Sequence, residues 1–370
     1  MHRVIFLPLL IFVLLHSCRA QRGEDTNNQL PQLDSLITAE LADKDIPSLT
    51  VGVVKDGEVV VAKGFGFADV EAGIPAGAGT IYQLGSVTKM FTGYLLATLI
   101  HGKHISLTDT LARFFPPETR FPRSPSGQSV TVRDIATHAA EFPRYPANLE
   151  RIDPDPIRGY SREAMLQGIG MVSIDTTVGV RYQYSNFGYG VLGVAMENRM
   201  EATLADLMDA YIFSPYSMPH SSLEYRSSFS DNLAVPYLEV APNRRTDPWN
   251  MEALAGAGNL FSCISDLNAF MIALLEDKEV NTIQQTPYLR INDTWSYGLG
   301  CFIIDSENRR TRIIYHGGDI DGYASSLTLY PEHKLGIVLL TNWGEGRVIG
   351  GVFTAVNNAI ADHYLGEPDN

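Results

Sequence analysis

Three short motifs contain the residue types that nucleophilic catalysis requires. They are Ser86-Val87-Thr88-Lys89, Tyr184-Ser185-Asn186 and His316-Gly317-Gly318, and the patterns S-x-x-K, Y-x-N and H-x-G each occur once in the chain. A serine hydroxyl becomes an effective nucleophile when a neighbouring base takes its proton. A lysine three residues further along a helix lies on the same face as the serine. The first motif therefore predicts Ser86 as a nucleophile and Lys89 as its base.

Each motif taken alone also has an ordinary structural explanation. A lone S-x-x-K is usually part of a solvated helix face, and a Gly-Gly pair after a histidine can form a bend beside a strand. Tyr184 could be a packed aromatic residue, and Asn186 could be a turn residue. Lys89 can act as a base only when it is partly neutral, which requires burial or nearby positive charge. The joint occurrence of the three motifs favours catalysis over these explanations.

The elements that must position the motifs can be followed in the hydrophobic pattern. Apolar residues recur at helical spacing beside Ser86 and near both chain ends, and β-branched runs predict strands early and late in the chain. The turn Lys55-Asp56-Gly57 joins the two early strands into a hairpin. The expected helices are 33–41, 90–99 and 348–364, and the expected strands are 49–54, 58–62, 299–304, 311–315, 325–330 and 335–340.

These patterns predict an α/β (α+β) fold with one antiparallel sheet, flanked by helices and assembled from both chain ends. Strands need partners along their edges, so the early and late strands are expected to pair. The α/β lobe would comprise residues 30–84 and 295–370, with a mostly helical lobe, residues 85–294, inserted between them. Ser86 would then lie at a helix start, Tyr184 in a loop and His316 at a strand end. A cleft between the two lobes needs this arrangement.

Length and composition are those of a globular protein. The 370 residues are 45% hydrophobic and 19% charged, which provides enough apolar surface for a packed core. The formal net charge of −14 argues against nucleic acid as a partner, because phosphate binding needs a basic face. We expect no metal and no cofactor, and the oligomeric state is left open. Cys263 and Cys301 could pair in an oxidising compartment or remain two buried thiols.

Residues 1–20 have the pattern of a targeting segment. Arg3 is followed by an apolar run over 4–15, and Cys18-Arg19-Ala20 offers small residues at a plausible cleavage point. The apolar run is too short to span a membrane, which takes about 20 residues. We therefore predict a signal peptide at 1–20, a single domain at 21–370, and export to the periplasm or the extracellular space. Lipid attachment at Cys18 is an alternative to cleavage.

The ordered motifs resemble those of class C β-lactamases and of their relatives, which include penicillin-binding carboxypeptidases, D-aminopeptidases and β-lactamase-fold esterases. The similarity runs from about Leu33 to Tyr364 and includes the segments Thr131–His138 and Leu335–Asn342. On this resemblance the chain is expected to be a serine hydrolase that acts on a small ester, amide or peptide substrate. β-Lactam hydrolysis, D-amino-acid peptidase activity, an acylated sensor and a non-catalytic scaffold are the alternatives.

The resemblance implies a role for each residue of the motifs. Ser86 would form the acyl-enzyme, Lys89 and Tyr184 would move its proton, and Asn186 would hold a substrate carbonyl. The backbone N–H groups of Ser86 and Asp319 would form an oxyanion hole. A helix start beside a Gly-rich strand end suits this task, because both can direct N–H donors at a developing negative charge.

The third motif bears on substrate binding, and here the chain departs from the family pattern. Gly317 and Gly318 would let a substrate approach the backbone closely. Class C β-lactamases carry, at the position of His316, a lysine that helps to hold the substrate carboxylate, whereas a histidine is largely neutral at pH 7. The carboxylates of Asp319 and Asp321 follow at once. We therefore expect uncharged esters and amides to be preferred over penicillins and cephalosporins, unless Asp319 points away and arginines of the helical lobe supply the missing positive charge.

A second departure concerns a loop. Relatives often carry a glycine at the position of Glu141, in the segment that follows His138. This difference leaves the local loop shape open and does not affect the catalytic groups.

Overall fold

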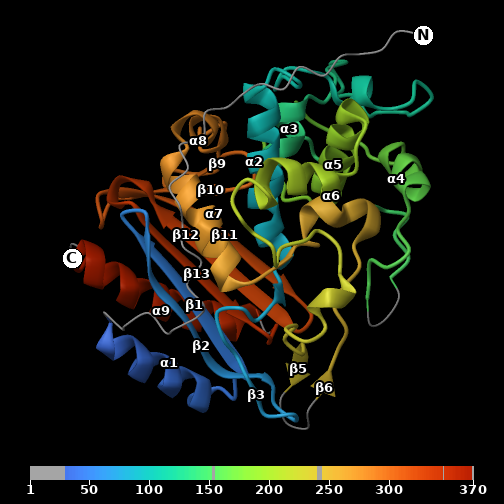
Figure 1. Ribbon diagram of the computed structural model, residues 1–370. Coiled ribbons are helices and arrows are strands. Elements are labelled where there is room, and N and C mark those ends of the chain that lie inside the picture. Colours follow the sequence, from blue (N-terminus) through green and yellow to red (C-terminus); the bar gives the residue numbers. More distant parts are fainter. Residues whose placement is uncertain (1–29, 152–154, 240–243, 345, 369–370) are drawn as a thin grey trace.

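A nine-stranded antiparallel sheet forms the central layer of the computed structural model, which describes residues 30–151, 155–239, 244–344 and 346–368 (Figure 1). The strand order is β3-β2-β1-β13-β12-β11-β10-β9-β8. The strands of this sheet are β1 (Ser48–Lys55), β2 (Glu58–Asp69), β3 (Ile74–Pro75), β8 (Leu289–Arg290), β9 (Trp295–Tyr297), β10 (Phe302–Ser306), β11 (Thr311–Ile320), β12 (Tyr323–Tyr330) and β13 (Leu335–Thr341).

The sheet joins the two ends of the chain. β1 lies between β2 and β13, and Val51 is opposite Lys63 on one side and Leu339 on the other. The hairpin turn between β1 and β2 has positive φ at Asp56 and Gly57, the backbone conformation that tight hairpin turns require. The prediction that early and late strands share one antiparallel sheet is therefore confirmed.

Helices cover both faces of the sheet. α1 (Pro31–Asp43) and α9 (Gly346–Leu365), which are far apart in the sequence, lie side by side on one face (Figure 1). Their apolar side chains, such as Ile37 and Val356, are buried together with side chains of β1 and β13. On the opposite face α7 (Ile264–Glu276) packs against the same two strands. β1 and β13 are thus buried on both sides.

α2 (Thr88–His101) runs through the middle of the helical region and carries the first motif. All its residues from Thr88 to Ala97 are buried. Apolar residues surround the helix axis, which is the pattern of a helix buried on every side. The other elements of this region are α3 (Val132–Ala136), α4 (Arg162–Ile169), α5 (Asn186–Met200), α6 (Leu204–Met208), α8 (Lys278–Gln284) and two short strand pairs, β4 (Tyr82–Gln83) with β7 (Phe261–Ser262) and β5 (Tyr237–Glu239) with β6 (Arg244–Arg245).

Two predicted boundaries near the motifs differ from the structure. Ser86 lies in a 3-10 turn, Gly85–Val87, and α2 begins only at Thr88. β11 continues to Ile320, so His316 lies within the strand and not at its end. The glycines that follow His316 weaken a strand without ending it, because their backbone groups still pair with β12.

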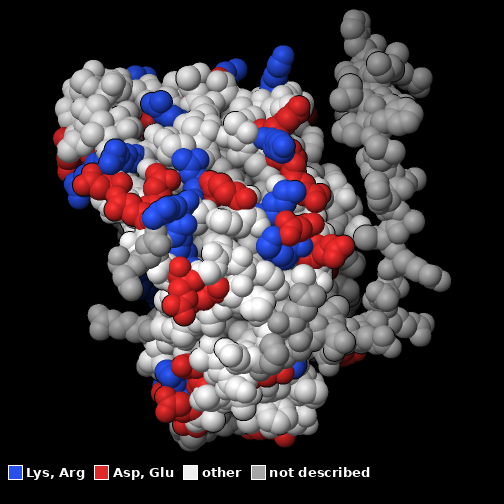
Figure 2. Space-filling model, turned by 90° about the vertical axis from the view of Figure 1, so that its left-hand side faces the viewer, with Lys and Arg blue, Asp and Glu red and all other residues white. Residues whose placement is uncertain are grey.

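Charged side chains of both signs are mixed on the described part of the face that Figure 2 shows. This face therefore carries no continuous basic surface of the kind that nucleic acid binding needs. No helix among the described residues is long and apolar enough to cross a membrane. The predicted signal peptide and Cys18 lie outside the described residues. Cys263 and Cys301 are buried free thiols, so the structure favours that alternative over a disulfide.

Candidate active site

Ser86, Lys89 and Tyr184 meet at one point between the helical region and the sheet. The Tyr184 hydroxyl donates a hydrogen bond to Ser86 Oγ at 2.8 Å, and Lys89 Nζ lies 3.1 Å from the same oxygen. Ser86 comes from the turn before α2, Lys89 from the first turn of α2, and Tyr184 from the loop that leads into α5. A serine within hydrogen-bonding distance of two proton-transfer groups has the arrangement that activates a nucleophile.

Lys89 is fully buried, and its surroundings favour the neutral amine. Its Nζ lies 2.8 Å from Asn186 Oδ1 and 2.6 Å from the carbonyl oxygen of Ala257. Burial, reinforced by the positive charge of Arg144, lowers the pKa of Lys89 well below its usual range. A neutral amine has two N–H donors and one lone pair, so Asn186 and Ala257 can accept both donors while the lone pair faces Ser86. In this form Lys89 can accept the serine proton.

Tyr184 stays protonated in the resting site. Burial raises the pKa of Tyr184 above its usual value, and the hydrogen bond to Ser86 opposes this shift only in part. The ring of His138 lies 4.5 Å from the Tyr184 ring, and His138 Nδ1 accepts the backbone N–H of Ser185 at 3.0 Å. His138 thus holds both the Tyr184 ring and the backbone of Ser185 in place. The sequence comparison included His138 only as part of a similar segment, without a role.

β11 approaches the backbone around Ser86 as closely as glycine allows. A Cβ added at Gly318 would lie 2.0 Å from the carbonyl oxygen of Leu84 and 3.0 Å from the backbone nitrogen of Ser86. A Cβ added at Gly85 would lie 3.0 Å from the backbone nitrogen of Asp319. This approach brings the backbone nitrogens of Ser86 and Asp319 near one another, as an oxyanion hole built from these two donors requires.

His316 is buried within β11 as a neutral imidazole. Its Nδ1 lies 2.7 Å from the carbonyl oxygen of Gly317, and its Nε2 lies 3.3 Å from the Tyr297 hydroxyl. A carbonyl oxygen only accepts, so Nδ1 carries the proton and Nε2 accepts from Tyr297. Burial lowers the pKa of His316 to about 3. A neutral group therefore occupies the position of the lysine of class C β-lactamases.

The cleft beside Ser86, the candidate catalytic cleft, has a volume of about 330 Å³. Asn186, one of the predicted substrate-binding residues, lies deeper than the cleft wall, and its side-chain oxygen is bound to Lys89. Its contact with a substrate carbonyl stays a prediction. The other predicted substrate-binding residues are in the wall, which includes Ser86, Arg144, Tyr184, Phe302, Tyr315, His316, Gly317, Gly318, Asp319 and Ser325.

Arg144 is a cleft residue that the motifs did not indicate. Its guanidinium lies over the Tyr184 ring, 5.4 Å from the ring centroid, and it forms no hydrogen bond or ion pair with the residues that the structure describes. Within the described wall of the cleft, Arg144 is the one cationic side chain and Asp319 the one anionic side chain. Burial and the charge of Asp321 raise the pKa of Asp319, and Arg144 lowers it. An arginine of the helical lobe therefore lies in the cleft, as one part of the alternative requires, but Asp319 lies in the same wall and does not point away from it.

Glu141 keeps the backbone conformation that a glycine would adopt. Its φ of 57° lies in the left-handed region, which non-glycine residues seldom occupy. The carboxylate of Glu141 accepts the backbone N–H groups of Asp175 at 2.9 Å and of Thr176 at 3.3 Å. These bonds offset the strain and hold the loop in place.

The antiparallel sheet, its flanking helices and the Ser-Lys-Tyr site at their junction define the class of β-lactamase/transpeptidase-like proteins. The family model named Beta-lactamase matches residues 33–351, and the chain belongs to this family. Among curated proteins the chain is similar to Protein flp of Staphylococcus aureus (strain MRSA252), with 24% identity over 91% of this chain and 68% of that protein. It is also similar to a Beta-lactamase of Yersinia enterocolitica, with 24% identity over 84% of this chain and 86% of that protein.

Two solved structures share the fold over most of the chain. An octameric penicillin-binding protein homologue from Pyrococcus abyssi has a TM-score of 0.79 and 25% identity, covering 92% of this chain and 78% of its own. A β-lactamase/D-alanine carboxypeptidase from Yersinia pestis has a TM-score of 0.78 and 18% identity, covering 90% of this chain and 99% of its own. The predicted fold class is confirmed by both.

Proposed function

We propose that this protein is a serine hydrolase that opens ester or amide bonds through an acyl-enzyme on Ser86. Members of the Beta-lactamase family are generally serine hydrolases. The observation that carries the proposal is the position of Ser86 Oγ, 3.1 Å from the buried amine of Lys89 and 2.8 Å from the Tyr184 hydroxyl. A scaffold without chemistry has no need to bury a lysine beside a serine, because burying an amine without a counter-charge is costly.

Acylation would use the two proton-transfer groups in turn. Lys89 takes the proton of Ser86 while Oγ bonds to the substrate carbonyl carbon, and the carbonyl oxygen becomes negatively charged. The N–H groups of Ser86 and Asp319 stabilise that oxygen. The bond to the leaving group then breaks, the leaving oxygen or nitrogen takes the hydroxyl proton of Tyr184, and Lys89 returns a proton to Tyr184. The acyl group remains on Ser86.

Deacylation would follow the same path with water in place of Ser86. Lys89 accepts a proton from the water while the water oxygen bonds to the acyl carbon. The bond between that carbon and Ser86 Oγ then breaks, and Lys89 returns the proton to Ser86. An acylated sensor differs only in that this second step is slow.

Relatives of the chain carry the names β-lactamase and D-alanine carboxypeptidase. The substrate panel should therefore contain nitrophenyl esters, a chromogenic cephalosporin and D-alanyl peptides, and a burst without turnover would indicate the sensor.

Covalent labelling tests the proposal directly. A fluorophosphonate probe should label the wild-type protein and should not label Ser86→Ala. Ser325→Ala is the matched control, because Ser325 also lies in the cleft wall but donates to the carbonyl oxygen of Leu84 and contacts neither Lys89 nor Tyr184. Circular dichroism and thermal unfolding would show that both variants are folded. Labelling that persists in folded Ser86→Ala would place the nucleophile elsewhere.

A further inference from the structure

A second cavity lies next to the turn between β11 and β12, away from the catalytic cleft. Its volume is about 950 Å³, compared with about 330 Å³ for the cleft, and the two share no wall residue. A Cβ added at Gly322, in that turn, would lie 2.4 Å from Pro236 and 2.8 Å from Thr246, so the turn packs directly on the cavity wall. We call it the Trp249 cavity, and its wall includes Tyr225, Leu233, Pro236, Thr246, Trp249 and Phe261.

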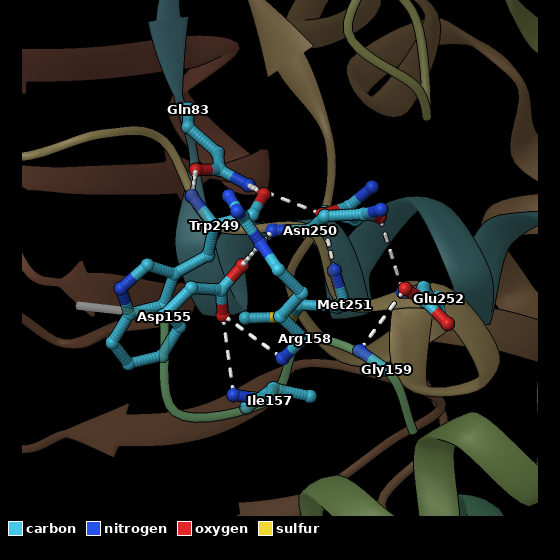
Figure 3. Close-up of polar contacts among 10 residues, drawn as sticks. Gln83, Asp155, Ile157, Arg158, Gly159, Trp249, Asn250, Met251 and Glu252 are labelled. Atoms are coloured by element: carbon cyan, nitrogen blue, oxygen red, sulfur yellow. Dashed lines mark hydrogen bonds and ion pairs between the residues drawn. The ribbon is translucent and has the colours of Figure 1, made fainter. Parts of the chain in front are cut away.

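The backbone of Trp249 is held by buried polar side chains (Figure 3). The carboxamide of Gln83 binds it twice, accepting the Trp249 N–H at 2.9 Å and donating to the Trp249 carbonyl oxygen at 2.8 Å. The next residue, Asn250, donates its backbone N–H to Asp155 at 2.6 Å. Gln83 and Asp155 are almost completely buried. The backbone of this wall is therefore formed in advance, and a ligand would not have to order it.

Two polar groups of the wall lack hydrogen-bond partners. The indole N–H of Trp249 and the hydroxyl of Thr246 are buried, and neither has a partner among the residues that the structure describes. Trp249 is only 9% exposed. A buried donor without a partner is unfavourable, and a ligand that offers an acceptor would recover that free energy. Because the indole N–H only donates and a hydroxyl can donate, a carbonyl oxygen would suit both.

The rings in the wall favour an aromatic guest. Tyr225 is 52% exposed, unusually high for so large a side chain, and its ring centroid lies 6.1 Å from that of the buried Phe261. Aromatic pairs at this separation gain stability from edge-to-face or offset contacts. A third ring placed between Tyr225 and Trp249 would cover apolar surface that water now contacts.

The charges around the cavity disfavour an anion. Three carboxylates, those of Glu224, Asp247 and Glu252, belong to the wall residues. The two cations of the wall are already paired, Arg245 with Asp69 at 3.0 Å and Arg158 with Asp155 at 3.5 Å. An anionic ligand would therefore meet unbalanced negative charge.

We propose that the Trp249 cavity binds an aromatic compound that carries a carbonyl oxygen and no negative charge, at a site separate from the catalytic cleft. The ring would pack against Trp249, Tyr225 and Phe261. Because both groups are covered in this structure, their side chains would turn toward the cavity, and the carbonyl oxygen would then accept from the indole N–H of Trp249 and from the hydroxyl of Thr246. The bound compound would lie against the turn whose preceding strand carries Asp319.

Indole N–H signals allow the cavity and the cleft to be observed separately in one sample. The chain has three tryptophans, so full-length protein with ¹⁵N-labelled indoles gives three such signals. Trp249 reports on the cavity. Trp295 reports on the cleft, because its ring centroid lies 5.5 Å from that of Phe302, a residue of the cleft wall. The signals are assigned with Trp249→Phe and Trp295→Phe.

The probes are N-acetylphenylalanine amide and two charged analogues, N-acetylphenylalanine and phenylalanine amide. We expect the neutral probe to shift the Trp249 signal and to leave the Trp295 signal unchanged. The carboxylate analogue should bind about tenfold or more weakly. Thr246→Val should weaken the neutral probe by about threefold to tenfold, the range for one lost hydrogen bond. Thr282→Val, an exposed threonine of α8, is the control that should change nothing.

Three results would overturn the proposal. The first is an unchanged Trp249 signal at millimolar neutral probe, and the second is equal affinity for all three probes. The third is loss of binding once a fluorophosphonate occupies Ser86, because the ligand would then belong to the cleft. The titration needs no turnover. Failure of Ser86 to form an acyl-enzyme would therefore leave it interpretable, and the two proposals can fail independently.

Discussion

The Tyr184 hydroxyl lies 2.8 Å from Ser86 Oγ, so the serine oxygen accepts a hydrogen bond before any substrate is present. Burial shifts the pKa values of the two proton-transfer groups of the site in opposite directions. It raises the pKa of Tyr184, which stays a donor, and lowers the pKa of Lys89, which becomes a base. Environments that separate two titratable groups in this way assign the acid and the base.

Removing either proton-transfer group should slow turnover strongly. We expect Lys89→Met and Tyr184→Phe each to lower kcat by about a hundredfold or more, the range for losing general acid–base catalysis. The double variant should be little slower than the worse single variant, because both groups serve one proton path. Tyr182→Phe is the matched control, since the buried Tyr182 hydroxyl has no partner in the described residues. Steady-state rates that fall multiplicatively in the double variant would contradict a shared path.

The sequence indicated the candidate residues Ser86, Lys89 and Tyr184 because their motifs are local. The spacing of Ser86 and Lys89 follows from helix geometry, and the alternating runs of the early and late strands need one another as partners. Both predictions rest on periodicities that a linear sequence displays. The same kind of reasoning misplaced the end of β11, because a Gly-Gly pair indicates a bend but does not require one.

The rest of the site depends on contacts between distant segments. Lys89 binds the carbonyl oxygen of Ala257, a backbone group 168 residues away that leaves no trace in residue type. Arg144 and His138 reach Tyr184 through the packing of a loop against α5, and no spacing in the sequence relates them. The wall of the Trp249 cavity likewise combines segments that only the fold brings together.

Adding a side chain at Gly318, where β11 passes close to Ser86, should impair catalysis more than folding. In Gly318→Ala the new Cβ would lie 2.0 Å from the carbonyl oxygen of Leu84 and 3.0 Å from the nitrogen of Ser86, so the strand must move away. We expect kcat/KM to fall about a hundredfold or more, as for loss of an oxyanion donor. Gly77→Ala, where the added Cβ meets nothing within 4 Å, should be neutral. Equal kinetics in the two folded variants would exclude this part of the mechanism.

His316 should make the folded protein sensitive to acid. Its folded pKa of about 3 lies below the value of about 6.5 in an unfolded chain. Between these values the unfolded chain binds a proton that the folded chain does not, so stability is lost as pH falls from about 6.5 towards 3. Between pH 7 and pH 5 the wild-type protein should lose about 2 kcal/mol more unfolding free energy than His316→Gln.

Denaturant unfolding at the two pH values measures this difference. The exposed His363, near the end of α9, provides the control, because its imidazole lies at the surface and not in the core. His363→Gln should therefore lose as much stability as the wild-type protein. A His316→Gln variant with the same loss would show that His316 takes up a proton in the folded state.

Arg144 should determine how substrate charge affects turnover. Its guanidinium lies 5.4 Å from the centroid of the Tyr184 ring and lacks an acidic partner among the described residues. A substrate carboxylate at about 4 Å would gain on the order of 1 to 4 kcal/mol from it. We therefore expect a free-acid ester to be turned over better than its methyl ester, and Arg144→Gln to raise KM for the free acid about tenfold. The methyl ester should respond little.

The pH dependence of free-acid against methyl-ester turnover tests whether the negative charge of Asp319 repels an anionic substrate. Because the pKa of Asp319 is raised, its carboxylate takes up a proton at a higher pH than an ordinary aspartate does, which weakens its repulsion of an anionic substrate. The ratio of free-acid to methyl-ester kcat/KM should thus increase as pH falls, and effects on Lys89 cancel in the ratio. Arg151→Gln removes the same charge from outside the cleft wall, over the Tyr145 ring, and should leave the ratio unchanged. A methyl-ester preference at pH 8 in the wild-type protein would instead restore the expectation that uncharged substrates are favoured.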